Sequence, residues 1–108
     1  MDNDEVKLRE IGFHYDGEEK VRIFLVDGNK VRNHMLINFT MGGHHYVYNR
    51  IPEDEIWIDD HNYDERAAVV EHEAHERKLM KFKKMSYSKA HDQANIVEKK
   101  SRKSNIAG

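Results

Sequence analysis

The sequence contains no cysteine among its 108 residues, and only one proline. The missing cysteines exclude a disulfide framework and a thiolate metal site, so a metal ion would need histidine, aspartate and glutamate ligands. No apolar run approaches the length of a membrane span. The acidic first twenty residues carry no apolar segment of signal-peptide length. We therefore expect a soluble protein of a reducing compartment, the cytoplasm.

Apolar residues are also scarce, at 38% of the chain against 35% charged residues. A chain of this length forms one domain with a single modest core. We expect residues 1–108 to form one domain, with loose termini at about 1–5 and 103–108.

The net charge of −2 hides an asymmetry between the two ends of the chain. Residues 1–76 hold 8 basic against 18 acidic residues, whereas residues 77–108 hold 10 against 2. The basic end could contact nucleic acid or an acidic partner. No aromatic residues interleave with the lysines of its tail, as a single-strand binder would need. A solvated helix face followed by a frayed tail is the favoured interpretation.

The first half of the chain is rich in β-branched and aromatic residues, which predicts a sheet over about residues 6–59. Asp-Gly tolerates positive φ, so IFLVDGNKVR is expected to be a β-hairpin. Further strands are expected in MLINF, HHYVYNR and IWID, with Trp57 in the core. We predict four or five strands, mostly antiparallel and joined as a meander.

The second half has helical periodicity. A first helix is predicted at about residues 63–83, with Asn62 and Glu65 as a capping box. A second is predicted at about 87–102, with Ser86 as its cap. The short connection makes them an antiparallel helical hairpin, and the whole chain an α+β domain.

Two polar side chains fall in the middle of the apolar stripe of the first helix. On a helical wheel His72 lies between Ala68, Val69 and Leu79, and Glu76 lies about 40° away. Arg77, by contrast, points elsewhere and is expected in solvent. Burying a histidine and a carboxylate costs free energy unless they are paired or bound to something.

The segment EHEAHERKLM resembles the zinc motif HExxH, with Glu76 in place of the second histidine. Residues at i and i+4 lie one above the other on one helix face, so His72 and Glu76 can bind the same metal ion. Zinc accepts nitrogen and carboxylate oxygen at similar distances. Glu73 would then be the catalytic general base.

The third ligand is left open between Glu98 and His91 on the second helix. The antiparallel register brings Glu98 level with His72, and His91 remains an alternative if the helices cross steeply. Zn²⁺ is the expected metal, and a site with two carboxylates would also suit Mn²⁺ or Fe²⁺ better than a histidine-rich site does. A hydrogen-bonded network without metal is the competing interpretation. His44 could add a ligand, but an exposed histidine at a strand start is the favoured reading of that position.

Three stretches carry a family resemblance: GGHHYVYNRIPEDEIWIDD, HEAHERKLM and MSYSKAHDQANIVE. Together they resemble small zincin-like (HExxE) metallopeptidase domains of bacteriophages and other mobile elements, some within large polyvalent phage proteins. The resemblance covers about residues 21–98. It implies a sheet, an active-site helix and a supporting helix, a peptide or protein substrate, and the host cytoplasm as the location. The functional positions that it implies are His72, Glu73 and Glu76, with His91 and Glu98 as further candidates.

Two function classes follow. The first is a zinc-dependent hydrolase, a peptidase. The alternative is a non-catalytic binding module that contacts a host protein or nucleic acid through its basic C-terminal helices. Open space beside Glu73 would favour the hydrolase, and a filled site would favour the binding module.

Overall fold

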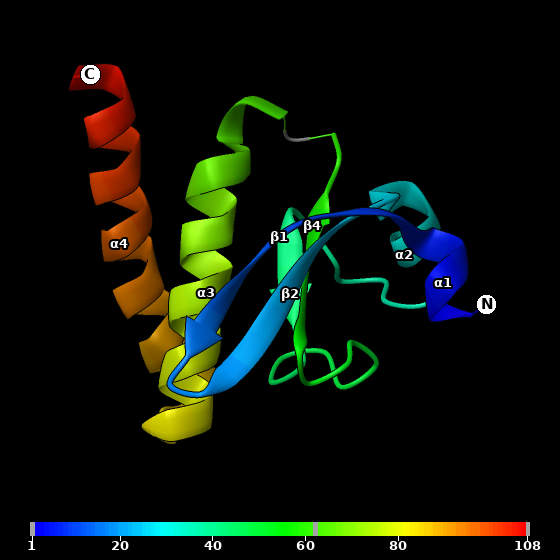
Figure 1. Ribbon diagram of the computed structural model, residues 1–108, viewed down its shortest axis with the longest axis horizontal. Coiled ribbons are helices and arrows are strands. Elements are labelled where there is room, and N and C mark those ends of the chain that lie inside the picture. The colour runs from blue at the N-terminus through cyan, green and yellow to red at the C-terminus, as the bar shows by residue number, and fades with distance from the viewer. Residues whose placement is uncertain (1, 62, 108) are drawn as a thin grey trace.

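The computed structural model describes the backbone of residues 2–61 and 63–107, and the side chains of residues 2–61 and 64–100. Helices and strands follow one another as α1 (Asn3–Val6), β1 (Lys7–Asp16), β2 (Glu19–Val26), α2 (Gly28–His34), β3 (Gly42–His44), β4 (Glu55–Asp59), the 3-10 turn η1 (Tyr63–Glu65), α3 (Arg66–Phe82) and α4 (Tyr87–Ala107). Figure 1 shows α3 and α4 side by side, with the sheet between them and the small helices α1 and α2.

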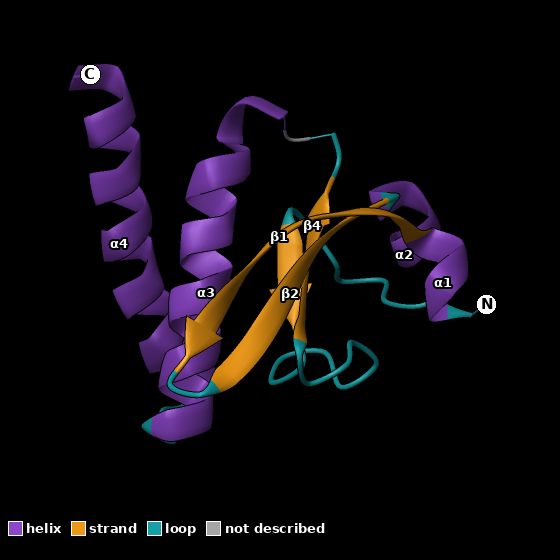
Figure 2. Cartoon of the chain, in the orientation of Figure 1, coloured by secondary structure: helices purple, strands orange, loops and turns teal. Residues whose placement is uncertain are grey.

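The four strands form one sheet in the order β1-β2-β4-β3. The pairs β1–β2 and β3–β4 are antiparallel, while β2 and β4 are parallel. The predicted α+β class, a mostly antiparallel sheet followed by two helices, is confirmed (Figure 2). The predicted meander is wrong, because a parallel pair needs a crossover, and residues 27–54 supply it.

The hairpin predicted in IFLVDGNKVR is wrong, and the observed hairpin joins β1 and β2. Its turn is Gly17–Glu18, where Gly17 has a φ of 65° that favours glycine. The Asp-Gly pair at residues 27–28 instead opens α2, where the Asp27 carboxylate accepts the backbone N–H of Lys30 at 3.1 Å. Asp-Gly suits a helix N-cap as well as a tight turn, and the local sequence does not separate the two uses.

Two other predicted strands are also absent from the described residues. MLINF is irregular, although Phe39 is fully buried, and in HHYVYNR only His44 belongs to a strand. Both segments form the crossover and contribute apolar side chains to the core. IWID is a strand as predicted, and every residue of β4 is buried, Trp57 completely.

The sheet has an apolar layer on each face. On the α3 side, the buried strand residues Val21, Ile23, Leu25, Ile56 and Ile58 pack with Val69 of α3. On the other side, the strand residues Phe24, Val26 and Trp57 pack with Val6 of α1, Val31 of α2, and Phe39 and Ile51 of the crossover. The strand β4 is therefore covered on both sides, and it gives α3 a rigid base.

The two C-terminal helices lie close to their predicted positions. The first begins with η1, and α3 ends at Phe82, one residue before the predicted end. The predicted cap Asn62 lies outside the described residues, and Glu65 at the cap position makes no side-chain cap bond. The helix α4 extends to Ala107, beyond the predicted end at 102 and through most of the expected loose tail. At the other end, the short helix α1 occupies most of the expected loose residues.

Arg77 of α3 is fully buried, so its predicted exposure is wrong. Its guanidinium donates to Asp16 Oδ2 at 2.7 Å and to Glu19 Oε1 at 2.6 Å, across the β1–β2 turn. It also donates to the carbonyl oxygen of Glu53, ahead of β4. One side chain thus ties α3 to two separate parts of the sheet.

Replacing Arg77 with leucine should lower the free energy of unfolding by about 3–5 kcal/mol, because it leaves the buried Asp16 carboxylate without its cation. Urea unfolding monitored by circular dichroism would measure the loss. Lys78→Leu, on the exposed side of the same helix, is the control and should change stability by less than about 0.5 kcal/mol. Equal stabilities for the two variants would contradict the structural role of Arg77.

Candidate metal centre

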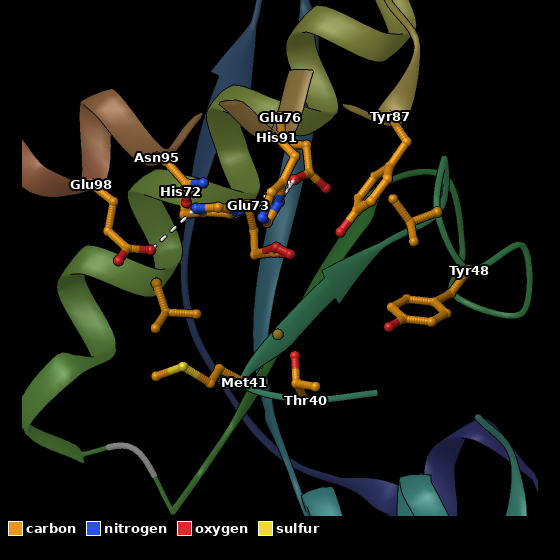
Figure 3. Close-up of a pocket in the computed structure, with 13 residues that line it drawn as sticks. Thr40, Met41, Tyr48, His72, Glu73, Glu76, Tyr87, His91, Asn95 and Glu98 are labelled. Carbon is orange, nitrogen blue, oxygen red and sulfur yellow. Dashed lines mark hydrogen bonds and ion pairs between the residues drawn. The ribbon is translucent and has the colours of Figure 1, made fainter. Parts of the chain in front are cut away.

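Three ligand-type atoms meet between α3 and α4. His72 Nε2 lies 3.2 Å from Glu76 Oε2, His91 Nδ1 lies 2.9 Å from the same oxygen, and the two nitrogens are 3.2 Å apart. Figure 3 shows His72, Glu76 and His91 gathered at one wall of a cavity. Burial of His72 and Glu76 follows from their place on the α3 face that packs on the sheet.

This triangle fits a tetrahedral cation. Ligands at about 2.0–2.1 Å from a zinc ion lie about 3.3 Å from one another, close to the three separations seen. Hydrogen bonds alone cannot satisfy all three of these contacts. Each ring nitrogen offers one hydrogen or one lone pair, so at most two of the three sides can hold a hydrogen bond. A cation above the triangle contacts all three atoms at once.

Glu98 occupies a different position from His91. Its Oε1 lies 3.1 Å from His72 Nδ1, on the side of the ring that faces away from the triangle. The two atoms are at ion-pair distance without the alignment of a hydrogen bond. Glu98 does reach His72, as the register of the helices suggested, but as a carboxylate behind the imidazole. Such a group orients a metal-bound histidine and increases its basicity.

Of the two α3 ligands, Glu76 already has the charge state that a metal ion requires, whereas His72 can bind a metal ion only as the neutral imidazole. The hydrogen bond with Glu76, opposed by burial, raises the pKa of His72. Burial would raise the pKa of Glu76, but hydrogen bonds from His44, His72 and His91 outweigh it and hold that pKa at about 2. Glu76 is therefore an anion at neutral pH and can act as a ligand without losing a proton.

His44 is a site residue that the sequence did not reveal. Its expected exposure is wrong: it is fully buried, and its Nε2 lies 2.8 Å from Glu76 Oε1. The sequence contained one indication of this burial, Gly42, two positions before His44. A Cβ at Gly42 would lie 3.1 Å from Glu73 Cγ, so glycine is what lets β3 approach α3 this closely.

Glu73 borders the same site and is nearly free of partners. It is 7% exposed, and its Oε2 has no hydrogen-bond partner within the described part of the chain. Burial, and then the negative charge of Glu76, raise the pKa of Glu73 to about 8. An oxygen of Glu73 lies within 4.8 Å of ligand atoms of Glu76 and His44. A bound cation would favour its ionised form.

A cavity of about 280 Å³ opens over these carboxylates. Its walls come from the segment before and within β3, from Tyr48, from α3 and from α4, and its lining residues are Thr40, Met41, Gly42, Val47, Tyr48, Val69, His72, Glu73, Glu76, Tyr87, His91, Asn95 and Glu98 (Figure 3). The site beside Glu73 is therefore hollow rather than filled by side chains.

The elevated pKa predicts how the metal-free protein responds to pH. Glu73 ionises near pH 4.5 in the unfolded chain and near pH 8 in the folded one, so stability falls as the pH rises between these values. At about 1.4 kcal/mol per pH unit, the loss is about 3–5 kcal/mol. Glu73→Gln keeps the shape without the charge. Chemical unfolding in EDTA should show the variant more stable than wild type at pH 8.5 and similar near pH 5. Parallel pH profiles would contradict the prediction.

A second acidic group, Asp59, Asp60 and His61, lies at the end of β4. Asp59 accepts from the His61 ring at 2.9 Å and from Arg32 of α2 at 3.1 Å. Burial opposes these bonds, but together they lower the pKa of Asp59. It also accepts the backbone N–H of His61 at 3.0 Å, so the partners of Asp59 belong to His61 and to α2.

Comparisons with protein-family models, with curated proteins and with solved structures found no match for this chain. The resemblance to zincin-like phage domains therefore stays a prediction. Among the described residues, none of the helices combines the length and the apolar character needed to cross a membrane.

Proposed function

We propose that this protein is a zinc-dependent hydrolase, a peptidase, with His72, Glu76 and His91 as the metal ligands. The observation that carries the proposal is the triangle of three ligand atoms, about 3 Å on each side, in the wall of a cavity. Glu98 lies behind His72 at ion-pair distance and would orient the ring by accepting its Nδ1 hydrogen. Glu73, beside the triangle, is a carboxyl group without a hydrogen-bond partner on Oε2 among the described residues.

Zinc held there would polarise the substrate carbonyl and lower the pKa of a coordinated water molecule. The carboxylate of Glu73 accepts a proton from the attacking water while the water oxygen bonds to the carbonyl carbon of the substrate. Glu73 then delivers this proton to the amide nitrogen as the C–N bond breaks. Its buried setting limits exchange of the proton with solvent.

Tyr87 is placed to assist beside the triangle, with its ring centroid 5.2 Å from that of His91. Its ring is directed into the cavity from the first turn of α4 (Figure 3). Burial, followed by the charges of Glu76 and Glu73, raises the pKa of its hydroxyl, which stays protonated at neutral pH. A protonated hydroxyl can donate to the oxygen on which negative charge develops.

The cavity's position favours a peptide as the substrate. It opens beside β3, the edge strand of the sheet, and Gly42 of this strand is part of its wall. An extended peptide can add to a sheet edge through main-chain hydrogen bonds. This would present a peptide bond to Glu73.

The direct test is cleavage of a mixture of quenched fluorescent peptides by protein loaded with one equivalent of zinc. We expect cleavage that EDTA stops and added zinc restores. A stoichiometric zinc complex that leaves every peptide and an unfolded protein substrate intact would overturn the hydrolase proposal.

The alternative function is a binding module, and the exposed lysines of the helical hairpin favour it. These lysines are Lys78, Lys83, Lys84, Lys89, Lys99 and Lys100. If they bind nucleic acid, the affinity should fall steeply with salt concentration, because each phosphate contact releases counterions.

A further inference from the structure

The two carboxylate oxygens of Glu76 have different partners. His72 and His91 approach Oε2, whereas His44 Nε2 approaches Oε1 at 2.8 Å. His44 comes from β3 and is fully buried, so solvent does not compete for this contact. The carboxylate therefore presents one oxygen to the two helical histidines and the other to the sheet.

The backbone fixes which nitrogen of His44 carries the hydrogen. The N–H of Tyr46 donates to His44 Nδ1 at 3.2 Å, so Nδ1 uses its lone pair as an acceptor. In a neutral ring the hydrogen then sits on Nε2, which faces Glu76 Oε1. A second hydrogen on Nδ1 would oppose the Tyr46 N–H. His44 is therefore a neutral donor to Glu76.

This tautomer also argues against His44 as a metal ligand. A ligand nitrogen needs a free lone pair, and His44 Nε2 carries a hydrogen instead. His44, Glu73 and Glu76 do place ligand-type atoms within 4.8 Å of one another. A second ion among them would have to displace either the Nε2 hydrogen or the Tyr46 hydrogen bond. The contact is better suited to holding Glu76 than to holding a metal.

We propose that His44 is a positioning residue: its hydrogen bond occupies Glu76 Oε1, so that only Oε2 is open to the metal ion. This inference rests on the proposed zinc site and adds the means by which the carboxylate is held to one-oxygen coordination. Without the hydrogen bond the carboxylate can rotate, and both oxygens compete for the ion. Groups that orient a metal ligand in this way typically contribute 10–100-fold to metal affinity.

The test compares His44→Leu with His44→Gln. Glutamine places an N–H donor near the position of the imidazole Nε2, whereas leucine fills the space without a donor. Zinc affinity, measured by competition with a chromophoric chelator, should fall 10–100-fold in His44→Leu and stay within a few-fold of wild type in His44→Gln. His45→Leu is the control. His45 neighbours His44 but donates its Nδ1 hydrogen to the Ile51 carbonyl oxygen, away from the site, and its replacement should leave the affinity unchanged.

A cobalt-substituted sample reports coordination directly. Wild type and His44→Gln should show the intense visible absorption of four-coordinate cobalt, and His44→Leu should show the weaker bands of a five-coordinate ion. A folded His44→Leu protein with wild-type zinc affinity and spectrum would overturn the role of His44. So would an equal loss in His44→Leu and His44→Gln. Absence of zinc binding in wild type would instead overturn the proposed function itself.

The wild-type protein offers a test that needs no variant to fold. ¹⁵N NMR of the histidine rings should show His44 with its hydrogen on Nε2, both before and after zinc is added. Loss of that hydrogen on adding zinc, with a ¹⁵N shift typical of a metal-bound nitrogen, would make His44 a ligand and contradict the proposal.

Discussion

Replacing Glu76 with alanine should abolish stoichiometric zinc binding, because Glu76 supplies the oxygen on which both histidines converge. In wild type, zinc at a thousand times its dissociation constant would add about 4 kcal/mol of stability. For a domain of this size, that corresponds to a rise in melting temperature of about 15–30 °C. Glu76→Ala should show no such rise. Metal analysis and thermal unfolding, each with and without EDTA, would measure both effects.

The same assay separates the two candidates for the third ligand. His91→Ala should lose zinc nearly as completely as Glu76→Ala, since His91 Nδ1 is part of the triangle. Glu98→Ala should lose only about 10–100-fold in affinity, as expected for a group behind His72. Glu71→Ala, at an exposed position of α3, is the control. The reverse order for His91 and Glu98 would contradict the ligand set.

Glu73→Gln should reduce peptide hydrolysis by a factor of about 10²–10⁴ while zinc remains bound, because glutamine cannot accept the proton of the attacking water. The variant keeps the size and burial of the side chain. Its kcat should therefore fall far more than its substrate affinity. Single-turnover peptide cleavage and metal content would be measured on the same zinc-loaded samples.

Two controls sharpen that result. Glu71→Gln makes the same chemical change at an exposed position on α3 and should leave the rate unchanged. Glu73→Asp keeps the carboxyl group on a side chain that is one methylene shorter, and it should retain part of the activity. Full activity in zinc-loaded Glu73→Gln would mean that another group takes the proton.

The sequence predicted the helical half of the fold well, because its signals are local. An apolar stripe interrupted by His72 and Glu76 marks both the buried face of α3 and the candidate site. The antiparallel register of the two helices brought Glu98 to His72. Which of Glu98 and His91 faces Glu76 depends on side-chain direction, which residue spacing does not determine.

Long-range contacts set the features that the sequence missed. Arg77 is buried because Asp16 and Glu19, about sixty positions earlier, neutralise it. His44 is buried because Gly42 lets β3 approach α3, and its partner Glu76 is 32 residues away. The parallel pairing of β2 and β4 depends on a crossover that contains α2. This helix begins at an Asp-Gly pair, and the same pair is equally suited to a hairpin turn, so the local sequence did not reveal the crossover.

The position of Glu76 has a consequence for how the domain is held together. Its carboxylate receives His44 from β3 and His91 from α4, so one side chain of α3 joins three parts of the structure. The helix α4 packs chiefly on α3. In a chain without cysteine, an ion shared by His72 and His91 would be a reversible cross-link between residues 19 positions apart. Chelation would then act on α4 much as reduction of a disulfide acts on a secreted domain, and slowed amide exchange along this helix would reveal the link.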